Sequence, residues 1–424
     1  MIGAEKIIEK KKEFLYPSSQ KNHFYQNPPQ IVKGKMQYLY DDQGKEYLDF
    51  FAGVSVMNCG HCNPDILETT ISQMQTLQHT TIIYLTEQMV QLAEKLASVL
   101  PGNLKRSFFC CTGSEANEGA MLLARLYTGK NEFIALNNGL HGRTYLTMSA
   151  TGIPMWRADP DLSPAIHFAK TVWDERYDLE TAAKESIESI KAIIKERGAD
   201  QIAALIAEPI QGNGGIITPP HWYFKELKQI LEANHILLII DEVQTGFART
   251  GKMFAIEHYD IVPDIMTVAK ALGNGMPISA FCTNDEVAKA FTKPSASTLG
   301  GNPVSSATAM AVLDYIEKHD LCSRADELGQ LLKNHLIALQ SKYPLIKDVR
   351  GLGLMLGVEL VKENGEPASE ETDFILEKLK DRGVIVGKNG LNRNILAFQP
   401  PLVITKENIE TLIRELDAIF TELK

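Results

Sequence analysis

An aspartate and a lysine in this chain stand where their side chains can take part in covalent chemistry. Asp241 directly follows the apolar run LLII at 237–240, and Lys270 ends the stretch DIMTVAK. A lysine just beyond a buried strand loses part of its hydration, and its neutral amine then forms a Schiff base with an aldehyde. A carboxylate at a neighbouring strand end can hold a protonated ring nitrogen. A buried Lys–Asp ion pair would explain these two residues equally well. Another sequence feature is needed to distinguish Schiff-base chemistry from an ion pair.

That further feature is the stretch SFFCCTGSEANEGAMLLARL, residues 107–126. An apolar run leads into a tight turn at Gly113 and Ser114 and then into a helical pattern. Glycine lets the backbone approach a ligand, and the free amides of a helix start attract an anion such as phosphate. The simpler alternative is a capping box between Ser114 and Asn117, but that motif prefers Glu or Gln at its second position. Lysine, carboxylate and phosphate turn together indicate pyridoxal phosphate as the cofactor.

The elements that must position these residues are apolar runs alternating with helical patterns from about residue 85 to 320. The runs SFFCC, EFIAL, QIAALIA, ILLII and DIMTVA each end in polar or Gly-rich residues. The segments LTEQMVQLAEKLASVL and TAAKESIESIKAIIKERG repeat apolar residues at helical spacing. We therefore expect an α/β protein with a mostly parallel, doubly wound sheet and a ligand at the carboxyl ends of its strands.

The two ends of the chain predict a second, smaller α+β domain. QYLYDDQGKEYLDFFAG, residues 37–53, is typical of a β-hairpin with Gln43 and Gly44 at the turn. Helices and short strands such as LGLMLGVELV follow residue 320. We expect 1–55 and 321–424 to form the smaller domain, and 56–320 to form the large domain that binds the cofactor.

Composition argues against several other classes of protein. The chain has 424 residues and a formal net charge of -10, which disfavours binding to a nucleic-acid backbone. No apolar run reaches the ~18 residues that span a bilayer, and the first residues mix charges with apolar side chains, unlike a signal peptide. We therefore expect no membrane association and a cytoplasmic location. Cys59 and Cys62 lack a second ligand pair at zinc-site spacing, so no metal is expected.

The order of motifs resembles the class III, omega-type aminotransferases of pyridoxal phosphate fold type I. The resemblance implies that Lys270 carries the cofactor aldehyde and that Asp241 holds its ring nitrogen. It also implies a homodimer with shared active sites, in which Thr298 of the partner subunit joins Gly113 and Ser114 at the phosphate. The matching motifs cover nearly the whole chain: YLYDDQGKEYLDFFAG, NCGHCNP, GSEAN, HGRT, EPIQG, DEVQTGFARTGK, AKALGNGMP, TLGGNP, VRGLGLMLGVEL and PPLVIT.

The same resemblance assigns the other contacts with the cofactor. It implies that Gln244 reaches the phenolic oxygen, that Val243 packs on one face of the ring, and that Glu208 supports the hydrogen-bond network nearby. Leu140 stands where the family commonly has Phe or Tyr, so apolar contact replaces ring stacking. For His141 two roles are open, a contact with the ring region or packing alone.

The substrate side departs from the family pattern. Ala397 stands where an arginine usually grips the α-carboxylate, and Asn213 replaces the glutamate that gates this arginine in the 4-aminobutyrate type. The arginine and the glutamate are expected to be lost together, because a buried glutamate without its arginine partner would destabilise the folded protein. Arg143 is retained, and its counterpart in 4-aminobutyrate and ornithine enzymes binds a carboxylate distant from the reacting amine. The alternative role of Arg143 is to order its own loop.

These features predict an aminotransferase that moves an amino group from a primary amine or omega-amino acid to a keto acid such as pyruvate. Val54 is expected at the substrate, and Arg393 or Lys388 is a candidate movable anchor for a carboxylate. The alternative is a racemase or epimerase of amino acids or lactams, because absence of the α-carboxylate arginine suits a neutral lactam. A regulator without catalysis is disfavoured, since Lys270 and Asp241 are both present and no basic DNA-binding module is attached.

Overall fold

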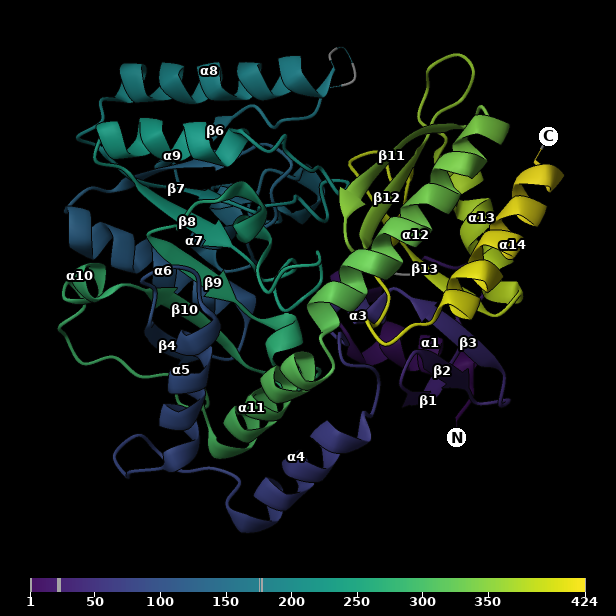
Figure 1. Cartoon of the computed structure of the whole chain (residues 1–424), viewed down its shortest axis with the longest axis horizontal. Helices are drawn as coiled ribbons and strands as arrows, with labels where there is room; N and C mark the ends of the chain where they lie inside the picture. The colour runs from purple at the N-terminus through teal and green to yellow at the C-terminus, as the bar shows by residue number, and fades with distance from the viewer. Residues whose placement is uncertain (1, 21–23, 175, 177, 424) are drawn as a thin grey trace.

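A computed structural model describes residues 2–20, 24–174, 176 and 178–423, and this part of the chain contains two separate sheets (Figure 1). In the first sheet, built from residues 106–283, the five strands from β9 to β6 pair in parallel, and β10 runs antiparallel to both of its neighbours. The prediction of a mostly parallel α/β sheet is confirmed. The strand order is β4 (Arg106–Cys110), β10 (Ser279–Thr283), β9 (Ile265–Val268), β8 (Leu237–Asp241), β7 (Ile202–Ala207), β5 (Glu132–Leu136) and β6 (Ile166–Ala169).

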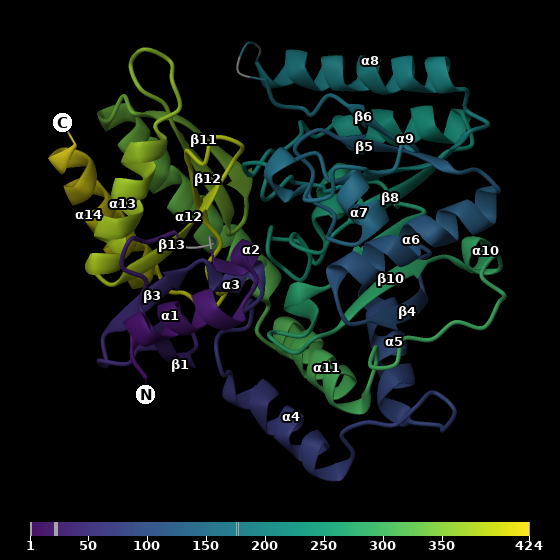
Figure 2. The ribbon, with the colours of Figure 1, turned by 180° about the vertical axis from the view of Figure 1, so that it is seen from behind.

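Helices cover both faces of this sheet because its central strands are apolar on both sides. Every residue of β7 and β9 is buried, as expected for parallel strands between two helical layers. Helices α6 and α7 lie on the face nearer the viewer in Figure 2, and α9 lies on the face nearer the viewer in Figure 1. The covering helices are α5 (Glu87–Val99), α6 (Gly113–Thr128), α7 (Tyr145–Ala150), α8 (Leu179–Arg197) and α9 (Tyr223–Ala233).

The second sheet, also of seven strands, joins the two ends of the chain. Its first three strands lie before residue 51, and β3 pairs in parallel with β13, where Leu48 faces Val384. The predicted hairpin is present as β2 and β3. Helices α12 (Leu321–Lys342), α13 (Ser369–Asp381) and α14 (Lys406–Glu422) pack beside this sheet (Figure 1). The strand order is β1 (Ile31–Lys35), β2 (Tyr38–Asp41), β3 (Glu46–Phe50), β13 (Val384–Asn389), β14 (Ile395–Phe398), β12 (Met355–Leu360) and β11 (Ile346–Leu352). The domain limits at 55 and 320 stay a prediction.

A buried arginine ties the two sheets together. The side chain of Arg249 is fully buried in the loop that follows β8. Its Nη1 donates to the carbonyl oxygens of Leu354 (2.9 Å) and Pro400 (2.6 Å), and its Nη2 donates to Asn58 Oδ1 (2.5 Å). These partners lie in the connections of the second sheet and in the segment that follows β3, so one side chain fixes the two sheets at their junction.

The other described elements are short or lie outside the two sheets. Helix α4 packs against α11, which also packs against α5. Among the described residues no helix is both long and apolar enough to cross a membrane. These elements are α1 (Ala4–Phe14), α2 (Pro17–Gln20), α3 (Ala52–Ser55), α4 (Pro64–Thr76), α10 (Asp285–Ala288), α11 (Pro303–Lys318), and the 3-10 turns η1 (Pro154–Trp156), η2 (Ala255–Tyr259) and η3 (Lys270–Leu272).

Candidate active site

The carboxylate of Asp241, at the end of β8, is buried and receives three hydrogen bonds. Asn117 Nδ2 (2.7 Å) and His141 Nδ1 (2.8 Å) lie at Oδ2, and the backbone N–H of Val243 donates to Oδ1 (3.0 Å). Asn117 also donates to the carbonyl of His141 (2.7 Å) and accepts from the hydroxyl of Thr267 (2.6 Å). Asp241 is therefore held purely as an acceptor, the arrangement that lets a carboxylate face a cation.

Lys270 lies just beyond the end of the neighbouring strand, as the first residue of η3, with Ala269 between it and β9. Its φ of 46° is uncommon for a residue with a side chain. Desolvation by the surrounding protein lowers the pKa of its amine, while the nearby charges of Asp241 and Glu208 oppose this effect. An amine whose pKa lies below the ordinary lysine value is neutral more often, and it then acts as a nucleophile or a proton acceptor.

The first turn of α6 forms the third part of the site, beside Asp241 and Lys270. Its cap is Thr112, whose Oγ1 accepts from the backbone N–H of Glu115 (3.2 Å), while Glu115 Oε2 accepts from the backbone N–H of Thr112 (2.8 Å). The capping box is thus Thr112–Glu115 and not the Ser114–Asn117 pair considered above. Because Ser114 is not the cap, its hydroxyl oxygen is available to accept from the backbone N–H of Arg143 (3.0 Å).

One cavity of about 420 Å³ is lined by Asp241, by Lys270 and by the first turn of α6. Gly113 is needed there, because a Cβ at this position would lie 2.9 Å from Val243 Cγ1. Val56, Trp156 and Met276 add apolar surface to the walls. Eight of the residues predicted from the sequence line the cavity: Gly113, Ser114, Leu140, His141, Arg143, Asp241, Val243 and Lys270.

The lining fits pyridoxal phosphate by the chemistry of its groups. The amine of Lys270 would hold the aldehyde carbon, the acceptor-only carboxylate of Asp241 would hold the protonated ring nitrogen, and the helix start at Gly113 and Ser114 would hold the phosphate. These groups are an amine, an anion and an anion-binding turn around one cavity. They match the three polar ends of the cofactor.

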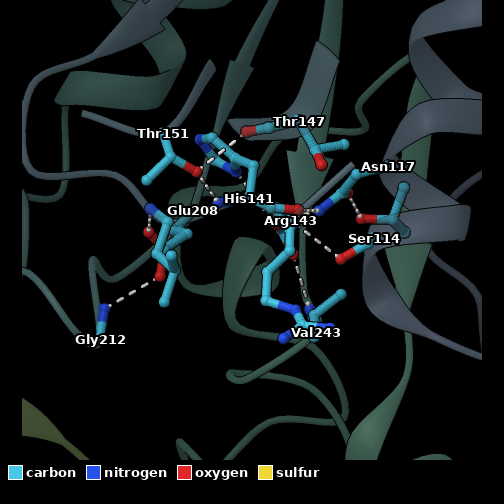
Figure 3. Close-up of polar contacts among 12 residues, drawn as sticks. Ser114, Asn117, His141, Arg143, Thr147, Thr151, Glu208, Gly212 and Val243 are labelled. Carbon is cyan, nitrogen blue, oxygen red and sulfur yellow. Dashed lines mark hydrogen bonds and ion pairs between the residues drawn. The ribbon is translucent and has the colours of Figure 1, made fainter. Parts of the chain in front are cut away.

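Glu208 and Gln244 lie behind the cavity and do not line it. Glu208 accepts from the backbone N–H of Leu140 (2.8 Å) and of Gly212 (3.0 Å), so it ties the loop after β5 to the loop after β7 (Figure 3). Burial raises the pKa of Glu208 to about 7, with the charge of His141 opposing and that of Asp241 adding to the rise. Gln244 is buried beside Gly212. Their predicted roles at the cofactor stay predictions.

Three further predicted residues lie outside the cavity lining. Ala397 is fully buried in β14, in an apolar cluster with Ile210, Ile216 and Met355. Val54 is exposed and lies in a left-handed turn, with a φ of 69°. Thr298 is exposed and borders a different cavity, and its role at the phosphate of a partner subunit stays a prediction.

The two candidate carboxylate anchors have other contacts in this structure. The guanidinium of Arg393 lies over the ring of Phe24, 5.1 Å from its centroid, and burial lowers the pKa of Arg393. Lys388 is buried and forms an ion pair with Asp373. Neither side chain lines the Lys270 cavity, so a role as anchor would require it to leave these contacts.

Sequence reasoning missed two side chains of the site. Asn117 lies one helical turn after Gly113, and that spacing could have placed it on the same face of α6. Trp156 lines the cavity from η1, a turn that carries no sequence signal for a ligand. Near the Cys59–Cys62 segment, His61 Nε2 lies 2.7 Å from Asp49 Oδ2, and among the described residues no group of three or more His, Cys, Asp or Glu side chains is placed to hold a metal ion.

Comparison with known proteins places this geometry in a family. The family model of class III aminotransferases matches residues 20–420. The protein named alanine–glyoxylate aminotransferase 2 homolog 2, mitochondrial, of Arabidopsis thaliana is 42% identical over 98% of this chain and 87% of its own length. A leucine/methionine racemase of Thermococcus litoralis is 38% identical over 99% of this chain and 96% of its own.

A solved structure agrees with the sequence comparison. A transaminase from a marine Virgibacillus bacterium superposes with a TM-score of 0.92 at 29% identity and covers 99% of both chains. The chain therefore belongs to the class III aminotransferases, a family of enzymes that depend on pyridoxal 5'-phosphate.

Proposed function

We propose that this enzyme moves an amino group from a primary amine or an omega-amino acid to a small keto acid such as pyruvate. The main support for this proposal is the lining of the Lys270 cavity. Val56, Trp156 and Met276 form apolar walls, and Arg143 adds an exposed guanidinium. Position 397, where the family usually has the arginine for an α-carboxylate, holds a buried methyl group. A donor therefore needs no carboxylate next to its reacting amine, and a distant carboxylate can bind Arg143.

The residues of the chain divide the chemistry among them. Pyridoxal phosphate, when bound, supplies an electron sink that lets the carbon next to the substrate nitrogen lose a proton. Lys270 Nζ accepts that proton and returns it later, because its lowered pKa keeps the amine available in its neutral form. Asp241 would hold a proton on the ring nitrogen of the cofactor, and Asn117 and His141 hold the carboxylate in place.

The first test is the half-reaction with the donor alone. Purified holoenzyme is mixed with 1-phenylethylamine, β-alanine, 4-aminobutyrate or L-alanine, and loss of the absorbance of the lysine-bound cofactor is followed. We expect the amines without an α-carboxylate to convert the cofactor, and pyruvate to reverse the change. Conversion by α-amino acids only would overturn the proposal.

A racemase is the second candidate, because a leucine/methionine racemase is among the relatives that match almost the whole chain. Incubation with L-leucine or L-methionine in the absence of a keto acid separates the two functions. Loss of optical activity with uptake of solvent deuterium at the α-carbon supports racemisation. Unchanged optical activity, together with alanine formed from pyruvate and an amine, supports amino transfer.

We also propose a homodimer in which Thr298 of the partner subunit completes the phosphate site. Thr298 is exposed, and the apolar side chains of Ile83 (81% exposed) and Tyr84 (66%) offer a surface for a second copy. Complementation tests the sharing of sites: Lys270→Ala and Thr298→Glu variants, each inactive alone, should regain activity when mixed and refolded together. A mixture that stays inactive would exclude the shared site. A cytoplasmic location stays a prediction from composition.

A further inference from the structure

The indole of Trp156 forms a wall of the Lys270 cavity and has a fixed orientation. Trp156 is half-buried at the end of η1 and lines the cavity together with Leu140 and Arg143. Its Nε1–H donates to Asn213 Oδ1 (2.9 Å). Because an indole nitrogen can only donate, the oxygen of the Asn213 amide must face it, and this bond sets the direction of the ring.

Asn213 itself belongs to a loop that is anchored at several points. The backbone N–H of the preceding Gly212 donates to Glu208 (3.0 Å), whose second oxygen accepts from Leu140 of the cavity wall (2.8 Å). The carbonyl of Asn213 accepts from the N–H of Gly390 (3.0 Å), in the loop between β13 and β14. The side chain of Asn213 therefore links the indole to a rigid frame shared by both sheets.

We propose that Trp156 determines substrate specificity, that Asn213 positions it, and that the enzyme prefers amine donors carrying an aromatic or flat apolar group. This inference rests on the proposed function, since it takes the Lys270 cavity as the substrate site. A tryptophan offers a large rigid apolar face that loses little conformational entropy on binding, and Val56 and Met276 extend the same surface. A short polar donor would lack an apolar group to pack against that surface.

Equilibrium binding tests the role of the ring without turnover. Calorimetry compares 3-phenylpropionate with propionate, two acids that differ by a ring and carry no amine, on the holoenzyme. We expect the ring to improve binding at least tenfold in the unchanged protein and about twofold in Trp156→Ala. The same tenfold preference in Trp156→Ala would overturn the proposal.

A matched tryptophan elsewhere in the chain serves as the control. Trp222 Nε1 donates to Glu180 Oε2 (2.9 Å), the same type of bond between an indole and a side-chain oxygen, and neither residue lines the Lys270 cavity. Trp222→Ala should leave the preference for 3-phenylpropionate unchanged. An equal loss in Trp222→Ala and Trp156→Ala would mean that the effect comes from general destabilisation and would count against Trp156.

A double-mutant cycle tests the positioning role of Asn213. For 1-phenylethylamine we expect Trp156→Phe and Asn213→Ala each to raise KM about fivefold with little change in kcat. The double variant should be no worse than the more affected single variant, because both changes remove one bond. Asn213→Asp, which keeps an acceptor, should restore most of the KM. Effects of the two single changes that multiply, or no rescue by aspartate, would refute the positioning role.

The proposed function and the role of Trp156 can be refuted separately. If no amine converts the cofactor but the preference for the phenyl acid depends on Trp156, the proposed function is wrong and the binding site stands. If amines convert the cofactor but Trp156→Ala keeps the preference, the proposed function stands and this inference is wrong.

Discussion

Replacing Glu242 by glutamine should stabilise the folded enzyme at pH 8 and have little effect at pH 5. Glu242 follows Asp241 in the chain, but its side chain is fully buried away from the cavity lining. Its Oε1 accepts from the backbone N–H of Ile256 (2.7 Å), and its Oε2 accepts from the hydroxyl of Thr245 (2.5 Å). Glutamine keeps both contacts, since its oxygen can accept from Ile256 and its NH2 can donate to the hydroxyl oxygen.

The size of the effect follows from the pKa of Glu242. Burial raises this pKa from an ordinary 4.5 to about 7, while the bonds from Thr245 and Ile256 oppose the rise. A carboxyl group with a raised pKa contributes stability below pH 4.5, and that contribution is lost as the pH rises through 7. At ~1.4 kcal/mol per pH unit between pH 4.5 and about 7, the buried charge costs at most about 3.5 kcal/mol above pH 7. We expect Glu242→Gln to recover ~1–3 kcal/mol at pH 8 and under ~1 kcal/mol at pH 5.

Thermal unfolding at both pH values measures this difference. An unfolding entropy of ~0.9 kcal/mol/K for a chain of this length converts the gain at pH 8 to a rise of about 1–3 °C in Tm. Glu68→Gln, on the exposed face of α4, is the matched control and should shift Tm equally at both pH values. A lower Tm of Glu242→Gln at pH 8, or the same gain at both pH values, would refute the assignment of the effect to a buried charge.

Three other substitutions test the site and its support. Lys270→Ala should abolish the spectral half-reaction and the covalent fixing of the cofactor by borohydride; a fixed adduct in the variant would contradict the role of Lys270. Arg249→Lys keeps the charge but cannot reach all three oxygens, so Tm should fall by about 3 °C; an unchanged Tm would show that the junction does not need the guanidinium. Ala397→Arg alone should lower Tm by several degrees, because it places a charge in an apolar cluster. Adding Asn213→Glu should recover part of that loss and improve use of 2-oxoglutarate, and no recovery would count against a restored switching pair.

The residues that could be predicted from the sequence are those placed by strand ends. Asp241 and Lys270 follow apolar runs, and parallel strands with a common direction bring their carboxyl ends to one edge of a sheet. The same logic placed Gly113 and Ser114 after β4, which runs in the same direction as β8. Local sequence sufficed there because the strand period and the sheet topology leave little freedom.

The substrate side could not be predicted in the same way. Whether Ala397 faces the cavity depends on the register of β14, and a shift of one residue turns every side chain to the other face of the sheet. The structure places Ala397 in an apolar cluster. Trp156 reaches the cavity only through the path of the loop after α7, and its bond to Asn213 joins segments far apart in the chain. The cap at Thr112 could have been found, since TGSE carries the Thr-x-x-Glu signal.

The parallel pairing of β3 with β13 has a consequence for synthesis of the protein. Leu48 leaves the ribosome long before Val384, its partner across the two strands. At ~5–20 residues per second the first three strands wait roughly 20–70 s for β13. During that interval the buried side of β3, including Tyr47, Leu48 and Phe50, lacks its native cover. The nascent chain should therefore be most prone to aggregation, and most dependent on chaperones, until its last hundred residues have emerged.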